Sequence, residues 1–291
     1  HVTIIPLEKN FGFAKNNNTG IKWALEQGFE YVYLHNQDGF MEKDCLVKLV
    51  EAMEKDKTIG AAQSLIMLYP ETELINSAGN AYHFLGFGYC DGYRRSLLSL
   101  PKGELERVCR PLSKRDSEVD SRLLAGRPTP LRLPLERGES PAIEIAYASG
   151  ASLLLRADLL KLFGLLDEDF ISYHEDLEYS LRLKSLDYKI TLVPAAKFFH
   201  EYSFSRNKEK FYLMERNRFA VLLMYYNGLS LILILPAAIV MEIGLIFFAL
   251  MSGWLREKFD AYHYWLDLAH IRLWLAKRKV SNYFRFLVKM D

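Results

Sequence analysis

Residues 31–39 read Tyr-Val-Tyr-Leu-His-Asn-Gln-Asp-Gly and carry the strongest indication of the fold. The apolar and aromatic first half, residues 31–34, is typical of a buried β-strand. A polar cluster follows at once and ends in glycine. In open α/β sheets, ligands bind outside the carboxyl ends of the strands. This stretch therefore predicts a buried strand with a ligand site at its end.

Asn36 and Asp38 give that strand end a specific chemistry. Hard divalent cations such as Mg²⁺ and Mn²⁺ need oxygen ligands, and they often complete their shell with water and substrate phosphates. One fixed carboxylate after a strand fits this role. Asn, Asp and Gly are also common turn formers, so residues 36–39 taken alone favour a turn over a metal site.

Ordered segments alternate between strand-like and helix-like patterns on both sides of this stretch. Helices are expected at residues 21–28, 45–55, 158–163 and 177–186. Strands or ordered apolar runs are expected at 2–6, 59–67, 143–147, 151–155, 189–193 and 197–200, with Pro194 ending the run at 189–193. The alternation predicts an α/β fold whose sheet is mixed, mostly parallel and flanked by helices.

Three regions depart from this pattern. Residues 101–141 mix Arg, Glu, Ser and Pro without apolar periodicity, and we expect a mobile surface insertion there. Residues 229–251 are almost wholly apolar, and about 20 such residues suffice to cross a bilayer. Pro236 and Glu242 leave open that this segment re-enters or lies in the membrane. Residues 254–289 interleave aromatic and basic residues, which suits a helix in the membrane interface.

Composition excludes several classes of protein. The 37 Lys and Arg balance 36 Asp and Glu to a net charge of +1, so no nucleic-acid partner is expected. Three scattered cysteines argue for a reducing compartment and against a disulfide framework or a structural zinc site. The chain starts at His1 inside an expected strand, and we expect it to be truncated at its N-terminus.

Three further groups could do chemistry. Glu175 and Asp176 open the helix expected near 177–186, where the helix dipole stabilises carboxylates and an aspartate could accept a proton. Acids in a first helical turn are also common without any catalytic role. His200 could bind a metal or be a surface residue. Arg216 could grip a diphosphate, or lie on the solvated face of a helix near a membrane.

The order of these groups resembles that of glycosyltransferase family 2, especially its rhamnosyltransferase-like branch. The resemblance covers residues 2–226 without the insertion. Its motifs are Asn-Phe-Gly-Phe-Ala at 10–14, Asn-Thr-Gly at 18–20, Asn-Gln-Asp at 36–38, Tyr-Ala-Ser-Gly-Ala at 147–151, residues 164–170, Tyr-His-Glu-Asp-Leu-Glu at 173–178, Val-Pro at 193–194 before His200, and Glu-Arg-Asn-Arg at 215–218. Asn36 and Glu178 stand where other members carry aspartate.

This resemblance implies a GT-A fold over residues 1–226, without its first nucleotide-binding βαβ unit, and a membrane-associated helical tail over 227–291. It implies inverting transfer of a sugar, with rhamnose as a guess, from a nucleotide-diphospho-sugar to a hydroxyl of a glycan or lipid-linked acceptor. The expected setting is the cytoplasmic face of the cell membrane, in cell-surface polysaccharide or glycolipid synthesis.

The same resemblance implies roles for individual residues. Asp176 would be the general base, supported by Glu175. Mg²⁺ or Mn²⁺ would be held by Asp38, His200 and Asn36. The residues implied to bind the donor diphosphate are Asn10, Gly12, Asn18, Ser149, Gly150 and Arg216.

Two other functions stay open at this point. A GT-A-fold protein that had lost its donor pocket with the N-terminal unit would be a non-catalytic binding protein, and the chain by itself would then be inactive. A nucleotidyltransferase can share the general fold. A coding sequence with a strand, a turn and an aspartate upstream of His1 would favour the enzyme.

Overall fold

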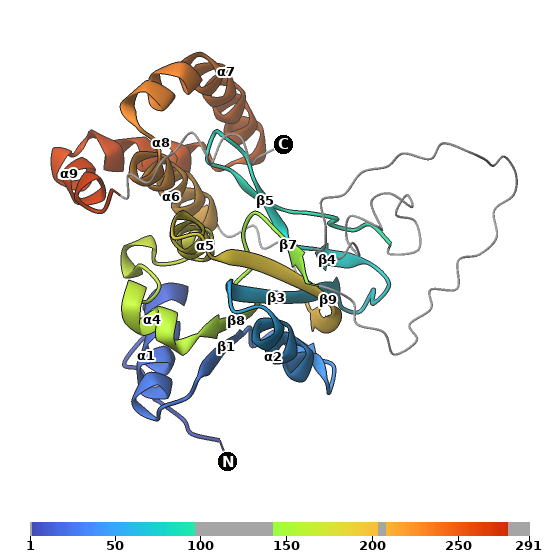
Figure 1. Cartoon of the computed structure of the whole chain (residues 1–291). Coiled ribbons are helices and arrows are strands. Elements are labelled where there is room, and N and C mark those ends of the chain that lie inside the picture. Colours follow the sequence, from blue (N-terminus) through green and yellow to red (C-terminus); the bar gives the residue numbers. More distant parts are fainter. Residues whose placement is uncertain (1, 97–141, 203–207, 279–291) are drawn as a thin grey trace, which may run out of the picture.

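The computed structural model describes residues 2–96, 142–202 and 208–278. Its core is one seven-stranded sheet in the order β1-β8-β3-β9-β2, with β4 paired to β3 and β7 to β9, and β5 and β6 form a separate hairpin (Figure 1). The strands are β1 (Tyr31–His35), β2 (Gly39–Met41), β3 (Ile59–Leu68), β4 (Ile75–Ser77), β5 (Asn80–Tyr82), β6 (Gly88–Cys90), β7 (Ile143–Glu144), β8 (Ser152–Arg156) and β9 (Lys189–His200). The helices are α1 (Phe13–Glu26), α2 (Cys45–Lys55), α4 (Ala157–Phe163), the 3₁₀ turn η2 (Glu168–Phe170), α5 (Glu175–Ser185), α6 (Lys208–Tyr225), α7 (Gly228–Ser252), α8 (Leu255–Leu266) and α9 (Leu268–Ala276).

The sheet is mixed and flanked by helices, as predicted, but the expectation of mostly parallel pairing is wrong. Among the described strands, β3 and β9 form the one parallel pair of this sheet. The reason is β8, which runs antiparallel between β1 and β3 and pairs with both of them. The short edge strands β2, β4 and β7 also pair antiparallel.

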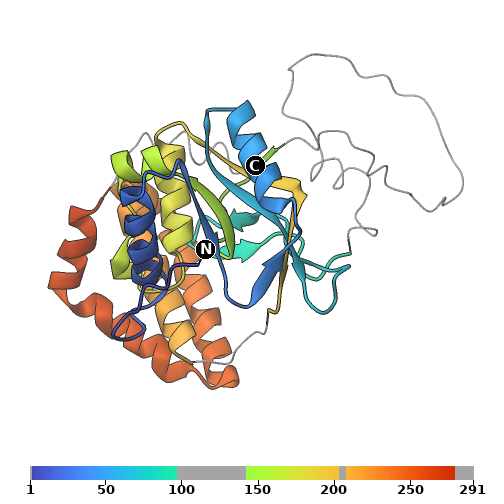
Figure 2. The ribbon, with the colours of Figure 1, turned by 90° about the horizontal axis from the view of Figure 1, so that it is seen from below.

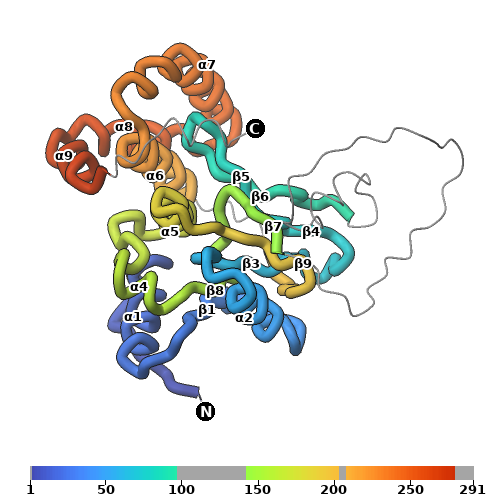
Figure 3. Tube along the Cα trace, in the orientation of Figure 1, coloured from blue at the N-terminus to red at the C-terminus, as the bar shows by residue number. Residues whose placement is uncertain are grey.

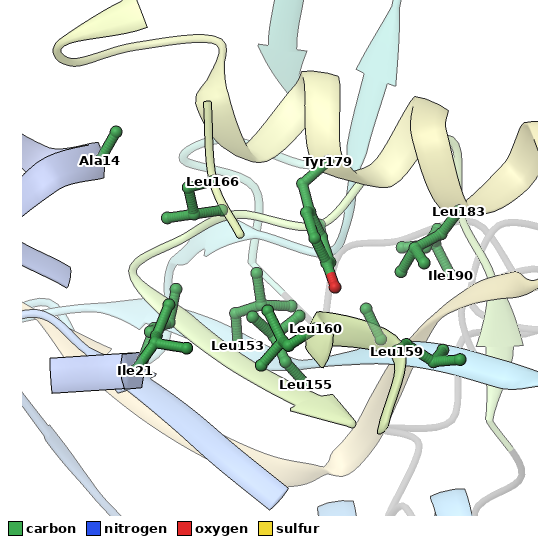
Figure 4. Close-up of a cluster of buried hydrophobic side chains, with 13 residues drawn as sticks. Ala14, Ile21, Leu153, Leu155, Leu159, Leu160, Leu166, Tyr179, Leu183 and Ile190 are labelled. Carbon is green, nitrogen blue, oxygen red and sulfur yellow. The ribbon is translucent and has the colours of Figure 1, made fainter. Parts of the chain in front are cut away.

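Helices cover both faces of the sheet because its central strands are apolar on both sides. α1, α4 and α5 pack on one face, and α2 packs on the other (Figure 2). Along β8, Leu153 and Leu155 face the first group while Leu154 faces α2, as the two-residue period of a strand requires. Tyr179 of α5 reaches down onto this leucine layer (Figure 4).

β9 continues where the sequence predicted a stop. Pro194 was expected to separate two strands, yet one strand runs from Lys189 to His200. Val193 pairs with Ser64 and Lys197 with Leu65, so residues 194–196 form a bulge with no partner on β3. A bulge is where a sheet accommodates proline, because the residue there donates no ladder hydrogen bond. Lys48 Nζ donates to the carbonyl of Ala195 at 2.8 Å and holds the bulge against α2.

Three other expectations concern the ends and the insertion. Residues 2–6 are exposed and form no strand, because no sheet edge pairs with them in the part that the structure describes. The apolar segment forms the single helix α7 with Pro236 inside it. The aromatic and basic segment that follows forms two helices, α8 and α9, in place of one. The expected insertion at 101–141 lies outside the described residues.

Candidate active site

The acidic pair lies at the start of α5, with one carboxyl paired and the other enclosed. Asp176 Oδ2 accepts a hydrogen bond from the Gly150 N–H at 3.0 Å, and Oδ1 accepts one from the Leu177 N–H at 2.7 Å. Glu175 is only 4% exposed, and its Oε2 has no partner among the described residues. Burial raises the pKa of Glu175 well above the ordinary value, and the nearby Asp176 charge adds to this rise.

Burial also raises the pKa of Asp176, but the two backbone N–H groups favour its charged form and act in the opposite direction. The two carboxyls therefore differ in their contacts: both oxygens of Asp176 accept backbone N–H groups, whereas Glu175 Oε2 has no partner among the described residues.

The loop that leads into α5 has a strained backbone. Ile171, Tyr173 and His174 have φ of 64°, 69° and 70°, a region that residues with a Cβ rarely adopt. Such strain persists only when surrounding contacts fix it, and it is concentrated at functional sites. The contacts that fix residues 170–174 come from two helices distant in sequence.

α6 provides the larger set of these contacts. Asn217, fully buried, donates from Nδ2 to the carbonyls of Phe170, Ser172 and Tyr173 at 2.9, 2.9 and 2.6 Å. Arg216 donates to the carbonyls of Asp169 and Phe170 at 2.7 and 2.9 Å. α6 thus lies beside α5 in the chain trace (Figure 3) and holds the segment just before the acidic pair.

The start of α1 provides the second set. The Ala14 N–H donates to the Ile171 carbonyl at 3.0 Å, and the Phe13 N–H donates to Ser172 Oγ at 2.9 Å. Gly12 has φ of 94°, and a Cβ there would lie 2.6 Å from the Ile171 oxygen. Only glycine allows α1 to approach the loop this closely.

His200 is the centre of a second cluster, at the adjoining ends of β1, β2 and β9. Its Nε2 lies 3.0 Å from Asp38 Oδ1 and 3.4 Å from Asn36 Nδ2. Its Nδ1 lies 2.9 Å from Oδ1 of Asn76, which is buried. The structure thus brings together the three residues expected to hold a metal and adds Asn76, which no sequence motif indicated.

The hydrogen bonds of His200 indicate what this cluster can bind. The Asn76 oxygen is an acceptor, so Nδ1 of His200 donates to it, and this contact directs Nε2 toward Asp38. Nε2 and the Asp38 carboxylate oxygen lie 3.0 Å apart, a separation that suits a proton shared between them or two ligands of one cation. No group of three or more His, Cys, Asp or Glu side chains suited to a metal occurs in the described residues. Asp38 and His200 therefore fit a divalent ion that takes its other ligands from water and phosphate.

Three side chains missed by the sequence reasoning lie between the two clusters. The Tyr202 ring lies 5.7 Å from that of His200, and Lys210 Nζ lies 3.5 Å from the Tyr202 hydroxyl. Lys210 is 9% exposed, and burial lowers its pKa. Burial, together with the nearby Asp176 charge, raises the pKa of Cys90 to about 11. Lys210 is thus a largely buried cation whose Nζ lies over the rings of Tyr202 and of Tyr173, the latter in the loop before α5.

Two of the residues expected to bind the donor lie beside Asp176. The Ser149 N–H donates to Gln63 Oε1 at 2.7 Å, and Gln63 is fully buried. Gly150 donates to Asp176, and a Cβ on Gly150 would lie 2.8 Å from the Phe13 ring. Both residues therefore adjoin the start of α5, next to Asp176.

The other four have their polar groups engaged in the fold. Asn10 Oδ1 accepts from the Gly12 N–H at 2.9 Å. Asn18 is 2% exposed and bonds the backbone of Leu166 through both its oxygen and its nitrogen. Arg216 is 4% exposed, so the alternative of a solvated face is wrong; its guanidinium donates to the Asp169 and Phe170 carbonyls and lies over the Tyr264 ring. Gly12, Asn10 and Arg216 therefore support the acidic pair indirectly.

Residues 1–103 match the family model of Glycosyl transferase family 2. No curated protein matches the chain in sequence. Among solved structures, GalNAc-T7 crystallised with UDP, GalNAc and Mn²⁺ has a TM-score of 0.50 at 14% identity. The match covers 76% of this chain and 36% of that one. At this identity the likeness shows the fold, and it confirms the expected GT-A-like architecture.

Proposed function

We propose that the chain is part of a glycosyltransferase that moves a sugar, with inversion, from a nucleotide-diphospho-sugar to an acceptor hydroxyl. The observation that carries this proposal is the geometry of Asp176, whose carboxylate lies at a helix start and accepts hydrogen bonds from two backbone N–H groups. The family match over residues 1–103 and the GT-A-like fold support it. The proposed setting is cell-surface polysaccharide or glycolipid synthesis at the cytoplasmic face of the cell membrane.

In the proposed reaction, Asp176 accepts the proton of the acceptor hydroxyl as that oxygen forms its bond to the anomeric carbon. The bond from the anomeric carbon to the diphosphate breaks on the opposite face, and the nucleoside diphosphate leaves with the electron pair. A Mg²⁺ or Mn²⁺ ion held by Asp38 and His200, with Asn36 close by, would supply charge neutralisation for that leaving group. In this proposal Lys210 adds a second positive charge, and Ser149 and Gly150 border the donor.

The test is a panel of nucleotide-diphospho-sugars, including dTDP-rhamnose, offered to the full-length protein with Mg²⁺ or Mn²⁺. Asp176→Asn should lower transfer by about 10²- to 10⁴-fold and leave donor binding intact. Asp187→Asn is the matched control, because Asp187 is exposed at φ 64°, which asparagine accepts. Undiminished transfer by Asp176→Asn would remove Asp176 from the base role.

The same panel, extended with nucleoside triphosphates and sugar phosphates, separates the two rival functions. A wild-type protein that binds donors without turning any of them over would be a binding protein. Release of pyrophosphate from a nucleoside triphosphate and a sugar phosphate would indicate a nucleotidyltransferase.

A further inference from the structure

We propose that α7 lies in the plane of the membrane surface, embedded in one leaflet with both ends on the side of the catalytic site, and does not cross the bilayer. This inference rests on the membrane location given under the proposed function, and not on the identity of the reaction. Length and hydropathy alone do not separate the two arrangements. The 25 residues of α7 would extend about 38 Å, more than the bilayer core of about 30 Å.

α7 contacts the protein near both of its ends and at its middle, all on one side of the helix. Ser230 near one end and Ala249 near the other are buried, and Leu231 and Ile234 contact the cluster of buried side chains around α6. Ala249 follows Leu231 by 18 residues, which is five helical turns and returns to the same face. This face rests on the folded domain, so the helix axis runs along the surface of that domain at the top of Figure 1.

The middle of α7 is held by a buried ionic cluster. The Glu242 carboxylate pairs with Arg218 of α6, bonds Lys258 Nζ of α8 at 2.6 Å, and accepts from the Tyr262 hydroxyl. Glu215 of α6 pairs with Arg218 at 2.8 Å and with Lys258. Two acids and two bases thus balance, and Arg218 and Lys258 are almost fully enclosed.

A crossing helix is incompatible with this cluster. Glu242 is the fifteenth of 25 residues, so crossing would place it near the centre of the bilayer. Either the cluster would break and leave charges unpaired in hydrocarbon, or α6 and α8 would enter the bilayer with it. The second choice would submerge α6, whose Asn217 holds the loop before the acidic pair. Both are unfavourable, whereas an in-plane helix keeps the cluster on its protein side.

The outward side of α7 matches lipid tails. Every exposed residue between positions 229 and 251 is apolar, glycine or proline, so none of these side chains can donate or accept a hydrogen bond. Protein interfaces are only about 55–65% apolar and carry many hydrogen bonds. A face without any polar side chain favours hydrocarbon over a protein partner. Phe259 and Leu266 of α8 and Leu268 and Leu273 of α9 are also exposed apolar side chains.

The topology test uses Gly228→Cys and Ser252→Cys, one at each end of α7, in the full-length protein. Both positions are exposed, and a Cβ at Gly228 meets nothing within 4 Å. A membrane-impermeant maleimide is added to sealed vesicles whose cytoplasmic side faces outward, and peptide mass spectrometry resolves each labelled site. We expect both positions to label without permeabilisation and to equal extents. Labelling of one end only after permeabilisation would show a crossing helix and overturn the proposal.

A second experiment asks whether this face contacts lipid. The full-length protein is mixed with phosphatidylcholine and phosphatidylglycerol vesicles and floated through a density gradient. Phe247→Asp on the outward face should lower the floating fraction several-fold. Leu162→Asp on α4 is the matched control, since the two side chains are 65% and 70% exposed, and it should float like wild type. Equal flotation of both variants, or a wild-type protein that stays at the bottom, would overturn the proposal while leaving the transfer reaction testable in solution.

Discussion

Replacing Asn217 by alanine tests how the acidic pair is held in place. The side-chain amide donates to three carbonyls of residues 170–173, and its oxygen accepts from Arg216 Nε at 2.8 Å. Alanine removes all four contacts and leaves the strained loop without its main support. Because residues 171, 173 and 174 have positive φ, each can relax once the contacts are gone.

The magnitude follows from the exposure of the three acceptors. Ser172 and Tyr173 are near solvent, so water can replace the lost donor there at small cost. Phe170 is fully buried, although its carbonyl keeps the contact from Arg216. The variant loses the equivalent of two hydrogen bonds at about 1 kcal/mol each, and part of the cost of leaving the buried Phe170 carbonyl with one donor fewer. Together these terms lower the free energy of unfolding by about 2–3 kcal/mol. The turnover number should fall more than the Michaelis constant rises, because the donor site remains while the base is displaced.

The assay is urea unfolding in detergent micelles, followed by tryptophan fluorescence, with transfer measured on the same samples. Asn17→Ala is the control, since the half-buried Asn17 amide donates only to the Phe13 carbonyl and should change stability by less than about 0.5 kcal/mol. Asn217→Asp tests whether the side chain at 217 must donate hydrogen bonds to the loop. A carboxylate facing three carbonyl oxygens is repelled by them, so this variant should lower the free energy of unfolding more than Asn217→Ala does. A stability order with the aspartate variant above the alanine variant would refute donation to the loop.

Two further predictions concern the titrating and metal-binding groups. An unfolded glutamate loses its proton near pH 4, whereas burial raises the pKa of Glu175 in the folded protein well above that value. Between these two pKa values the folded protein binds more protons than the unfolded chain. The free energy of unfolding therefore falls as the pH rises from the unfolded pKa toward the folded one. Glu175→Gln should gain stability relative to wild type between pH 5 and pH 9 and show no such gain below pH 4 in urea titrations; an unchanged difference across this range would show that Glu175 is charged in the fold. Asn76→Ala removes the acceptor that fixes the His200 ring and should weaken Mn²⁺ binding, measured calorimetrically, by about 10- to 100-fold, with Asp38→Asn at least as weak; unaltered affinity would place the ion elsewhere.

The sequence predicted those elements whose pattern is local. The helix at 45–55 and the strand at 31–34 appear with nearly the same bounds, because apolar periodicity fixes them without reference to neighbours. Strand direction was not predictable in this way. Pairing depends on which strand is inserted between two others, and β8 enters between β1 and β3 from a distant part of the chain.

The residues of the candidate site also differ in whether a local sequence pattern could predict them. The association of Asn36, Asp38 and His200 was expected from a resemblance in motif order, and the structure brings them within hydrogen-bonding distance. Asn76 and Lys210 belong to no motif, and their place follows only from the fold. Arg216 was expected to bind the donor diphosphate, with a solvated helix face as the alternative, but contacts from η2 and from Tyr264 bury it.

The bulge in β9 makes the length of that strand as important as its composition. His200 lies opposite both Gly39 and Leu68, and residues 194–196 separate this part of the strand from the part paired with the start of β3. Side chains alternate faces with every residue, so deleting one residue from the bulge would turn His200 to the opposite face of the sheet. The acceptor Asn76 and the carboxylate of Asp38 would then face a glutamate, the residue after His200. The number of residues in the bulge at 194–196 thus determines which face of the sheet carries the His200 side chain. It thereby determines whether His200 and Asp38 can share a metal ion.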